Sequence, residues 1–164
     1  THISYDPSSE ELVEMTLMAS KEVKRFGIEP RVALLSHSNM GSSDSHTSEK
    51  VREAVRMLHE DHPDLMVEGE MHADNAMDEE LCKRSFPNSK LEGTANLFIM
   101  PNLDSANISF NMIRMFADGL MIGPILIGAA KPAHVMTASV TARGIVNMTA
   151  VAVAGAMEEE RWLL

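Results

Sequence analysis

The part of the sequence best suited to chemistry is a short polar segment between an apolar run and a predicted helix. Residues 36–42 read Ser-His-Ser-Asn-Met-Gly-Ser and directly follow the apolar residues 32–35. Small hydroxyl side chains and a glycine let backbone N–H groups approach a phosphate, and the amino end of the next helix adds partial positive charge. The segment lacks the Gly-Lys-Ser/Thr ending of a P-loop. The spacing therefore indicates either an anion-binding loop or a plain polar turn.

Nucleophilic catalysis and metal binding by the histidines are less well supported. His37 lies beside Ser36 and Ser38, but no Gly-x-Ser-x-Gly elbow surrounds them, so we expect no catalytic triad. His59 and His62 are spaced differently from the His-Glu-x-x-His zinc motif and have no evident third ligand. We therefore predict that both are surface histidines.

Two further groups carry reactive side chains around residues 70–82. Strand alternation would place Glu70 and His72 on one face, whereas Asp74 lies past the end of that strand, so we predict no metal site there. Cys82 has only two basic neighbours to activate it, and we expect a structural thiol.

Length and composition indicate a globular domain in a reducing compartment, which favours the cytoplasm. The chain has 164 residues, of which 45% are hydrophobic and 23% are charged. Its net charge of −10 argues against a nucleic-acid binder or an anionic-membrane binder, which need surplus Lys and Arg. A single cysteine excludes an internal disulfide, and no apolar run reaches the ~18 residues of a membrane span.

Two details of the composition lead to further expectations. The chain has 14 methionines and only 4% aromatic residues, which predicts a core filled largely by flexible thioethers. It begins at Thr1 rather than at a methionine, so we expect it to be part of a longer polypeptide.

Hydrophobic periodicity predicts alternating helices and strands. Ser8 and Glu11 have the spacing of a capping box, and Gly27 is a stop signal for the helix that they begin. Helices are expected over 8–26, 49–61, 73–84, 105–117 and 141–157, and strands over 31–36, 65–71, 95–100 and, as an edge or irregular strand, 122–128. This order predicts an α/β domain with a mostly parallel sheet.

The same pattern yields a core and a domain division. Helix 49–61 would bury Val51, Val55 and Leu58, and helix 105–117 offers Met112 and Phe116, with Ile108 and Met115, for a core face. We expect residues 1–164 to comprise one α/β domain over about 8–140 and a terminal helix over about 141–164 that packs on a neighbouring domain.

Ordered landmarks from about residue 8 to 157 resemble the second half of phosphate acetyltransferases (phosphotransacetylases). They include Phe-Gly-Ile-Glu-Pro-Arg-Val-Ala-Leu-Leu-Ser-His-Ser-Asn-Met-Gly-Ser at 26–42, Glu-Gly-Glu at 68–70, Gly-Thr-Ala-Asn at 93–96, Met-Pro-Asn-Leu at 100–103, Gly-Pro-Ile-Leu at 123–126 and Lys-Pro at 131–132. The resemblance implies a three-layer αβα fold with a mostly parallel sheet, of the isocitrate/isopropylmalate-dehydrogenase-like type.

Three departures from that family's pattern bear on catalysis. The resemblance implies an arginine that holds the acetyl phosphate, an aspartate that deprotonates the coenzyme thiol and an arginine that contacts the coenzyme. Ala138 stands at the first of these positions and Gly144 at the second, while Arg114 is shifted by one residue from the third. Loss of one charge-stabilising donor typically lowers a rate by ~10²–10³, so we expect no native acyl transfer.

Three other runs are similar to the phosphotransacetylase-like C-terminal region of hybrid bacterial NADP-dependent malic enzymes. They are Leu-Ser-His-Ser-Asn at 35–39, His-Val-Met-Thr-Ala-Ser at 134–139 and Arg-Gly-Ile-Val-Asn-Met-Thr at 143–149. That resemblance implies oxidative decarboxylation of malate to pyruvate by the longer polypeptide. For this region it implies a non-catalytic role in oligomer assembly and in allosteric inhibition by acetyl-CoA. NADP and a divalent metal, Mg²⁺ or Mn²⁺, would bind upstream domains, and no residue here maps onto those sites.

The resemblance also implies a ligand site and partners. The residues expected to line a site for acetyl-CoA or phosphate are Ser36, Ser38, Asn39, Gly41, Ser42, Lys131 and Thr137. We expect self-association to a dimer or larger, contacts with the upstream malic-enzyme domains, and no nucleic-acid or membrane partner. The alternatives are an active phosphate acetyltransferase, which makes acetyl phosphate from acetyl-CoA and phosphate, and a stand-alone binding protein.

Overall fold

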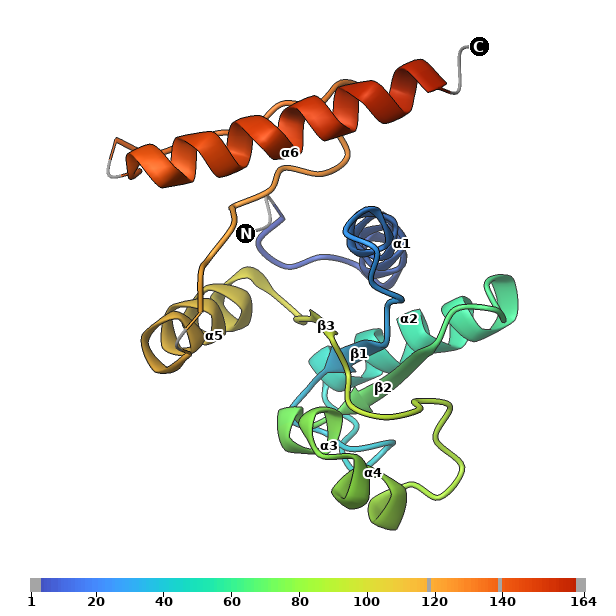
Figure 1. The fold of residues 1–164 in the computed structure, drawn as a ribbon. Helices are drawn as coiled ribbons and strands as arrows, with labels where there is room; N and C mark the ends of the chain where they lie inside the picture. Colours follow the sequence, from blue (N-terminus) through green and yellow to red (C-terminus); the bar gives the residue numbers. More distant parts are fainter. Residues whose placement is uncertain (1–3, 118, 139, 162–164) are drawn as a thin grey trace. The chain divides into compact units, whose positions relative to one another are not determined.

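Three parallel strands form the centre of the first part of the chain (Figure 1). The computed structural model describes residues 4–117, 119–138 and 140–161. These residues divide into two compact units, a first unit that ends at Ile108 and a second unit that begins at Ser109. The domain boundary that we expected near residue 141 stays a prediction.

The first unit alternates strands and helices in chain order. Its elements are α1 (Ser9–Arg25), β1 (Val32–Leu35), α2 (His46–Asp61), β2 (Val67–Met71), α3 (Ala73–Met77), α4 (Glu79–Ser85) and β3 (Leu97–Ile99). The sheet order is β2-β1-β3, so the central strand β1 is covered on both edges and all four of its residues are buried. The predicted α/β fold with a parallel sheet is confirmed, and the isocitrate/isopropylmalate-dehydrogenase-like assignment stays a prediction.

Helices α1 and α2 cover one face of this sheet. Leu12 of α1 packs in one apolar cluster with Val51, Val55 and Leu58 of α2 and with the strand residues Val32, Leu34, Val67 and Ile99. Burying an aliphatic side chain of this size stabilises the fold by about 1.5–3 kcal/mol. The buried face predicted for helix 49–61 is therefore confirmed in α2.

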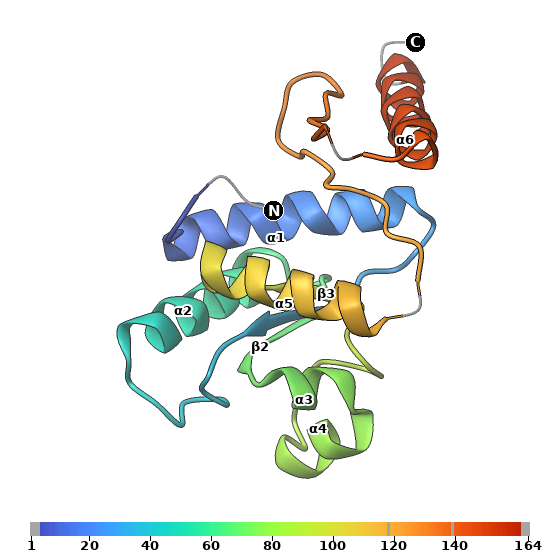
Figure 2. The ribbon, with the colours of Figure 1, turned by 90° about the vertical axis from the view of Figure 1, so that its left-hand side faces the viewer.

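The other face of the sheet carries a second cluster, which includes Ala33, Met71, Ala76 and Leu91. Figure 2 shows α3 and α4 on this side, opposite α1. The single helix expected over 73–84 is in fact two helices, because Asp78 has an extended backbone and caps the amino end of α4 through the N–H of Leu81.

Helix ends follow local capping signals. Ser8 caps α1, and Glu11 completes the capping box, as its spacing predicts. Gly27 follows the end of α1 with φ +73°, and its N–H donates to the carbonyl of Lys24. Helix α2 begins earlier than predicted because Ser45 accepts a hydrogen bond from the N–H of Ser48.

The second unit contains most of α5 (Leu103–Phe116) and all of α6 (Ala142–Arg161). The prediction of a strand at 122–128 is wrong, because these residues do not form a strand in the structure. Pro124 cannot donate a ladder hydrogen bond and Gly123 has φ +138°, both of which oppose a regular strand. Helix α5 buries no residue, so the core face predicted for it is also wrong.

The core is aliphatic rather than rich in methionine. Among the described residues, Met71 and Met148 are the methionines with buried side chains, whereas leucine, valine and alanine make up most of the core. The expectation of a thioether-filled core is therefore wrong. Within the described ranges, no helix combines the length and apolar character that crossing a membrane requires.

Candidate functional site

The candidate site lies where β1 and β2 end, and it begins with an irregularity in their pairing. Leu34 pairs with Gly69, whereas the next residue, Leu35, pairs with Met71, so Glu70 is an extra residue in β2. A bulge of this kind turns a side chain away from its regular direction. Gly69 permits it, because φ is +149° and a Cβ would lie 2.6 Å from the carbonyl oxygen of Leu34.

The side chain of Glu70 is fully buried and has four hydrogen bonds. Its Oε1 accepts from the hydroxyl of Ser38 at 2.7 Å, from the N–H of Gly41 at 2.8 Å and from Nη2 of Arg52 at 3.2 Å. Its Oε2 accepts from Nε of Arg52 at 3.2 Å. The guanidinium thus spans both oxygens, an arrangement that fixes the orientation of a carboxylate.

These contacts keep Glu70 ionised. Burial alone raises the pKa of the Glu70 carboxyl, but hydrogen bonds from Arg52, from the Gly41 N–H and from Ser38 outweigh it and hold the pKa below its ordinary value. The same pairing raises the pKa of Arg52, chiefly through its hydrogen bond with Glu70. A compensated negative charge therefore lies under the loop that follows β1.

The loop at 36–45 wraps around this carboxylate. Besides the bonds to the Glu70 side chain, the N–H of Met40 donates to the carbonyl of Glu70 at 2.8 Å. The N–H of Ser43 donates to Ser38 Oγ at 3.0 Å, and Nη2 of Arg52 donates to the carbonyl of Ser43 at 2.7 Å. Several of the donors that the sequence suggests for a bound phosphate are thus directed at an internal carboxylate.

A second group of contacts ties the loop to the residue after β2. The backbone N–H of His72 donates to Oδ1 of Asn39 at 2.7 Å, and Nδ2 of Asn39 lies 3.0 Å from Nδ1 of His72. The other ring nitrogen, Nε2 of His72, lies 2.8 Å from the carbonyl oxygen of His37. This pattern fits a neutral imidazole whose Nδ1 accepts a hydrogen bond from the amide of Asn39 and whose Nε2–H donates one to the carbonyl oxygen of His37.

The structure brings together the predicted site residues of the loop. Ser36 and Asn39 are half-buried, and Gly41 and Ser42 are exposed. Ser38 is fully buried against Glu70, so it shapes the loop from beneath. Lys131 and Thr137 belong to the second unit, where both are exposed. Ser139, beside the expected arginine position, lies outside the described residues. The ligand role of these residues stays a prediction.

The histidines and acidic residues have structural partners. His37 lies within 3.4 Å of Ser43 and Ser45 through Nε2, and His59 Nε2 lies 2.9 Å from the carbonyl oxygen of Val67. Within residues 4–117, 119–138 and 140–161, no group of three or more His, Cys, Asp or Glu is placed to hold a metal ion. Cys82 is buried, as a structural thiol would be.

Sequence reasoning missed Arg52 and the pairing of Glu70 with it. Arg52 lies on the first turns of α2 and looks like an ordinary surface residue of an amphipathic helix. One available signal was Glu-Gly-Glu at 68–70, because charged residues inside a buried strand require partners.

Comparison with known proteins identifies the family. Residues 1–153 match the family described as phosphate acetyl/butaryl transferase. The chain belongs to the phosphate acetyl/butaryl transferase family. A phosphotransacetylase from Streptococcus pyogenes superposes with a TM-score of 0.90 at 34% identity, covering 96% of this chain and 48% of that one. The predicted resemblance to phosphotransacetylases is therefore confirmed.

Higher identity is found with malic enzymes that contain a region of this phosphate acetyl/butaryl transferase family. The chain is 52% identical to the NAD-dependent malic enzyme of Rhizobium meliloti over 153 residues, covering 93% of this chain and 20% of that protein. It is 49% identical to the NADP-dependent malic enzyme of Escherichia coli over 160 residues, covering 97% and 21%. The chain thus spans about a fifth of the length of these relatives, and the predicted similarity to malic enzymes is confirmed.

Proposed function

We propose that this chain is a non-catalytic phosphotransacetylase-like module that regulates and assembles a malic enzyme. The longer polypeptide would decarboxylate malate oxidatively to pyruvate in the cytoplasm. The observation that supports this most directly is the 49–52% identity with malic enzymes along nearly the whole chain, against 40% over 132 residues with the phosphate acetyltransferase of Escherichia coli.

The proposed effector is acetyl-CoA, bound at the loop after β1. Open α/β sheets bind ligands outside the carboxyl ends of their strands, where this loop lies. The hydroxyls of half-buried Ser36 and exposed Ser42 lie on this loop, whereas the N–H of Gly41 and the side chain of Asn39 already bond to Glu70 and His72 and shape it. Lys131 and Thr137 are included in the proposed site on the family resemblance alone.

The absence of acyl transfer is proposed from two side chains that this sequence lacks. Ala138 and Gly144 offer neither the cation nor the base that the family's reaction uses. A Cβ at Gly144 would lie 2.8 Å from Cγ2 of Val140, so the local packing also disfavours a larger residue there. A positioned base contributes typically ~10²–10⁴ in rate, so its loss leaves a binding module.

Dinucleotide and metal binding are assigned to the rest of the longer polypeptide. The two malic enzymes are named for NAD and NADP respectively, and we retain NADP with Mg²⁺ or Mn²⁺ as the proposal. None of the described side chains of this chain is given a role toward either group.

The proposal is tested on the longer native polypeptide by calorimetry with acetyl-CoA and by malate-dependent reduction of NADP. We expect saturable heat with acetyl-CoA and a lower rate of malate oxidation when it is bound, because an effector shifts activity through its preference for one state. Absence of heat would remove the effector role. A rate that stays constant at saturating acetyl-CoA would remove the regulatory role.

The alternative, an active phosphate acetyltransferase, is separated by a direct assay of the same polypeptide. Acetyl phosphate formation from acetyl-CoA and phosphate at rates typical of enzymes would establish it. Our proposal expects none above background.

A further inference from the structure

A groove in the first unit lies near the amino end of β2, whereas the candidate site lies at the carboxyl end of β1. It has a volume of about 400 Å³ and is formed by the last turns of α1 and by residues 61–65, which connect α2 to β2. Because this connection precedes β2 while the loop at 36–45 follows β1, the two lie at opposite ends of parallel strands. Its size is within the ~300–1,000 Å³ typical of small-molecule sites.

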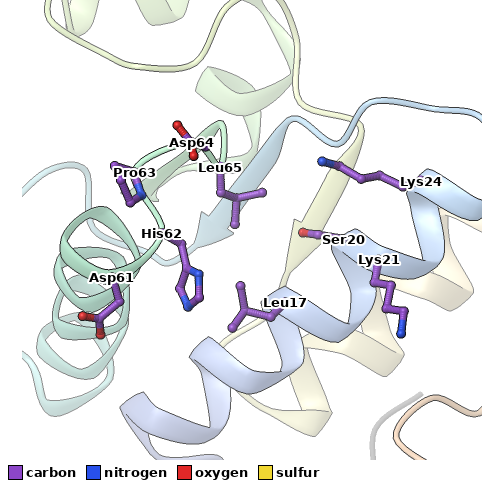
Figure 3. A pocket seen from close by; sticks show the side chains of 9 residues that line it. All are labelled: Leu17, Ser20, Lys21, Lys24, Asp61, His62, Pro63, Asp64 and Leu65. Carbon is purple, nitrogen blue, oxygen red and sulfur yellow. The ribbon is translucent and has the colours of Figure 1, made fainter. Parts of the chain in front are cut away.

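The interior of the groove combines apolar side chains with one unsatisfied hydroxyl. Leu17 and Leu65 point into it and also pack against the main core cluster (Figure 3). Ser20 is 5% exposed, and its hydroxyl points into the groove (Figure 3). Within the described part of the chain, that hydroxyl has no hydrogen-bond partner. A buried hydroxyl without a partner is costly, so a ligand that bonds to it gains an interaction that the protein alone does not make.

The charged side chains around the groove differ in direction, and the ammonium group of Lys21 points away from it (Figure 3). The ammonium group of Lys24 points inward and the imidazole ring of His62 lies against the groove beside Leu17, whereas the carboxylates of Asp61 and Asp64 point away (Figure 3). Lys24 pairs with Glu29 at 3.2 Å, but the two side chains are 54% and 71% exposed. Such an exposed pair is weak, so the ammonium can also bind an anion in the groove.

From this arrangement we infer that the groove binds a small organic carboxylate with a short branched apolar body. The carboxylate accepts hydrogen bonds from Nζ of Lys24 and from the hydroxyl of Ser20, and the apolar body packs on Leu17 and Leu65. Because both aspartates point outward, the charged lining group that faces the interior of the groove is the ammonium of Lys24. This site is independent of the proposed acetyl-CoA site.

The test uses 4-methylpentanoate as the probe and the amide spectrum of the whole chain as the readout. We expect saturable shifts at Leu17, Ser20 and Leu65 with a dissociation constant on the order of 1 mM, which suits a ligand of about eight heavy atoms. The uncharged 4-methylpentan-1-ol and the compact anion sulfate should bind at least ~10-fold more weakly, because the alcohol lacks the carboxylate and sulfate lacks the apolar body. Equal shifts with either compound, or no saturable shift with the acid, would overturn the inference.

Two substitutions and a control assign the contacts. Lys24→Met should weaken binding ~10-fold and Ser20→Ala about fivefold. Ser20→Ala should also keep or raise the thermal midpoint, because it removes an unsatisfied hydroxyl. Lys83→Met removes a comparably exposed lysine that pairs with Glu79 outside the groove, and it should leave the affinity unchanged. Unchanged affinity in Lys24→Met, with the spectrum of a folded chain, would contradict the proposed binding mode.

Discussion

Glu70 is the residue on which the loop at 36–45 most depends, because its buried carboxylate accepts hydrogen bonds from Ser38, Gly41 and Arg52. Glu70→Gln keeps the shape but removes the charge that Arg52 requires. We expect it to lower the free energy of unfolding by about 2–4 kcal/mol, as for other broken buried ion pairs. Urea denaturation measures this loss.

Glu53→Gln provides the matched control. Glu53 lies on the same helix as Arg52 and pairs with Arg56, but both side chains of that pair are about half exposed. Because such pairs contribute little, the control should leave the urea midpoint almost unchanged. Equal effects of the two substitutions would show that the buried Glu70 pair stabilises the fold no more than an exposed pair does.

The lowered pKa of Glu70 also makes stability depend on pH. The unfolded chain, with a glutamate pKa of about 4.5, binds the proton more tightly than the folded chain does. The contribution of Glu70 is therefore complete above this value and is lost as pH falls towards the folded pKa. Urea midpoints measured between pH about 7 and about 3 should show the gap between the native chain and Glu70→Gln narrowing below pH 4.5. A gap that stays constant over that range would mean that folding leaves the pKa of Glu70 unchanged.

At the scale of the strand, the bulge in β2 requires a residue without a side chain before Glu70. Gly69→Ala places a Cβ 2.6 Å from the carbonyl oxygen of Leu34 in a backbone with φ +149°. We expect a loss of about 3 kcal/mol or more in the free energy of unfolding, from strain and from the clash together.

Gly27→Ala separates these two causes. Gly27 also has a positive φ, +73°, but a Cβ there would meet no atom within 4 Å. Its substitution should cost only the backbone strain, about 1 kcal/mol. Urea denaturation of both variants compares the costs, and similar losses would contradict the close approach of Gly69 to β1.

Local patterns predicted the elements of the first unit better than they predicted the site. The capping box of Ser8 and Glu11 and the apolar face of α2 depend on residues a few positions apart, so local patterns suffice to find them. The Glu70 network joins residues 18 and 32 positions apart and depends on a one-residue bulge. No local pattern encodes such a contact, so the sequence alone does not reveal the partners of Glu70.

Helix α5 shows where periodicity alone fails. Helix α5 has the predicted extent within two residues, but Ile108, Met112 and Phe116 on its predicted core face are exposed. An amphipathic pattern indicates that a face needs to be covered, and it does not say by which element or which chain. The apolar face of α5 is therefore informative about assembly rather than about the internal core.

At the scale of the whole molecule, this face supports the proposed self-association. Ile108, Met112, Met115 and Phe116 recur at helical spacing and are 61%, 55%, 80% and 82% exposed. A contiguous exposed apolar face of this kind is typical of an interaction surface, and methionines adapt to a partner. We expect light scattering at micromolar concentration to give at least twice the 18.0 kDa of one chain.

Phe116→Glu tests whether that face forms the contact between two copies. Association would then bury a carboxylate in an apolar surface, and the free-energy cost of that burial exceeds the gain from the contact. The variant should scatter as a single chain while retaining the far-ultraviolet circular dichroism of the native protein. Phe26→Glu, which changes another exposed phenylalanine in the first unit, should leave the mass unchanged. A native chain that remains at 18.0 kDa would exclude self-association of this polypeptide. A Phe116→Glu variant with undiminished mass would place the contact on another surface, since a fully packed interface does not tolerate an unpaired buried charge at its centre.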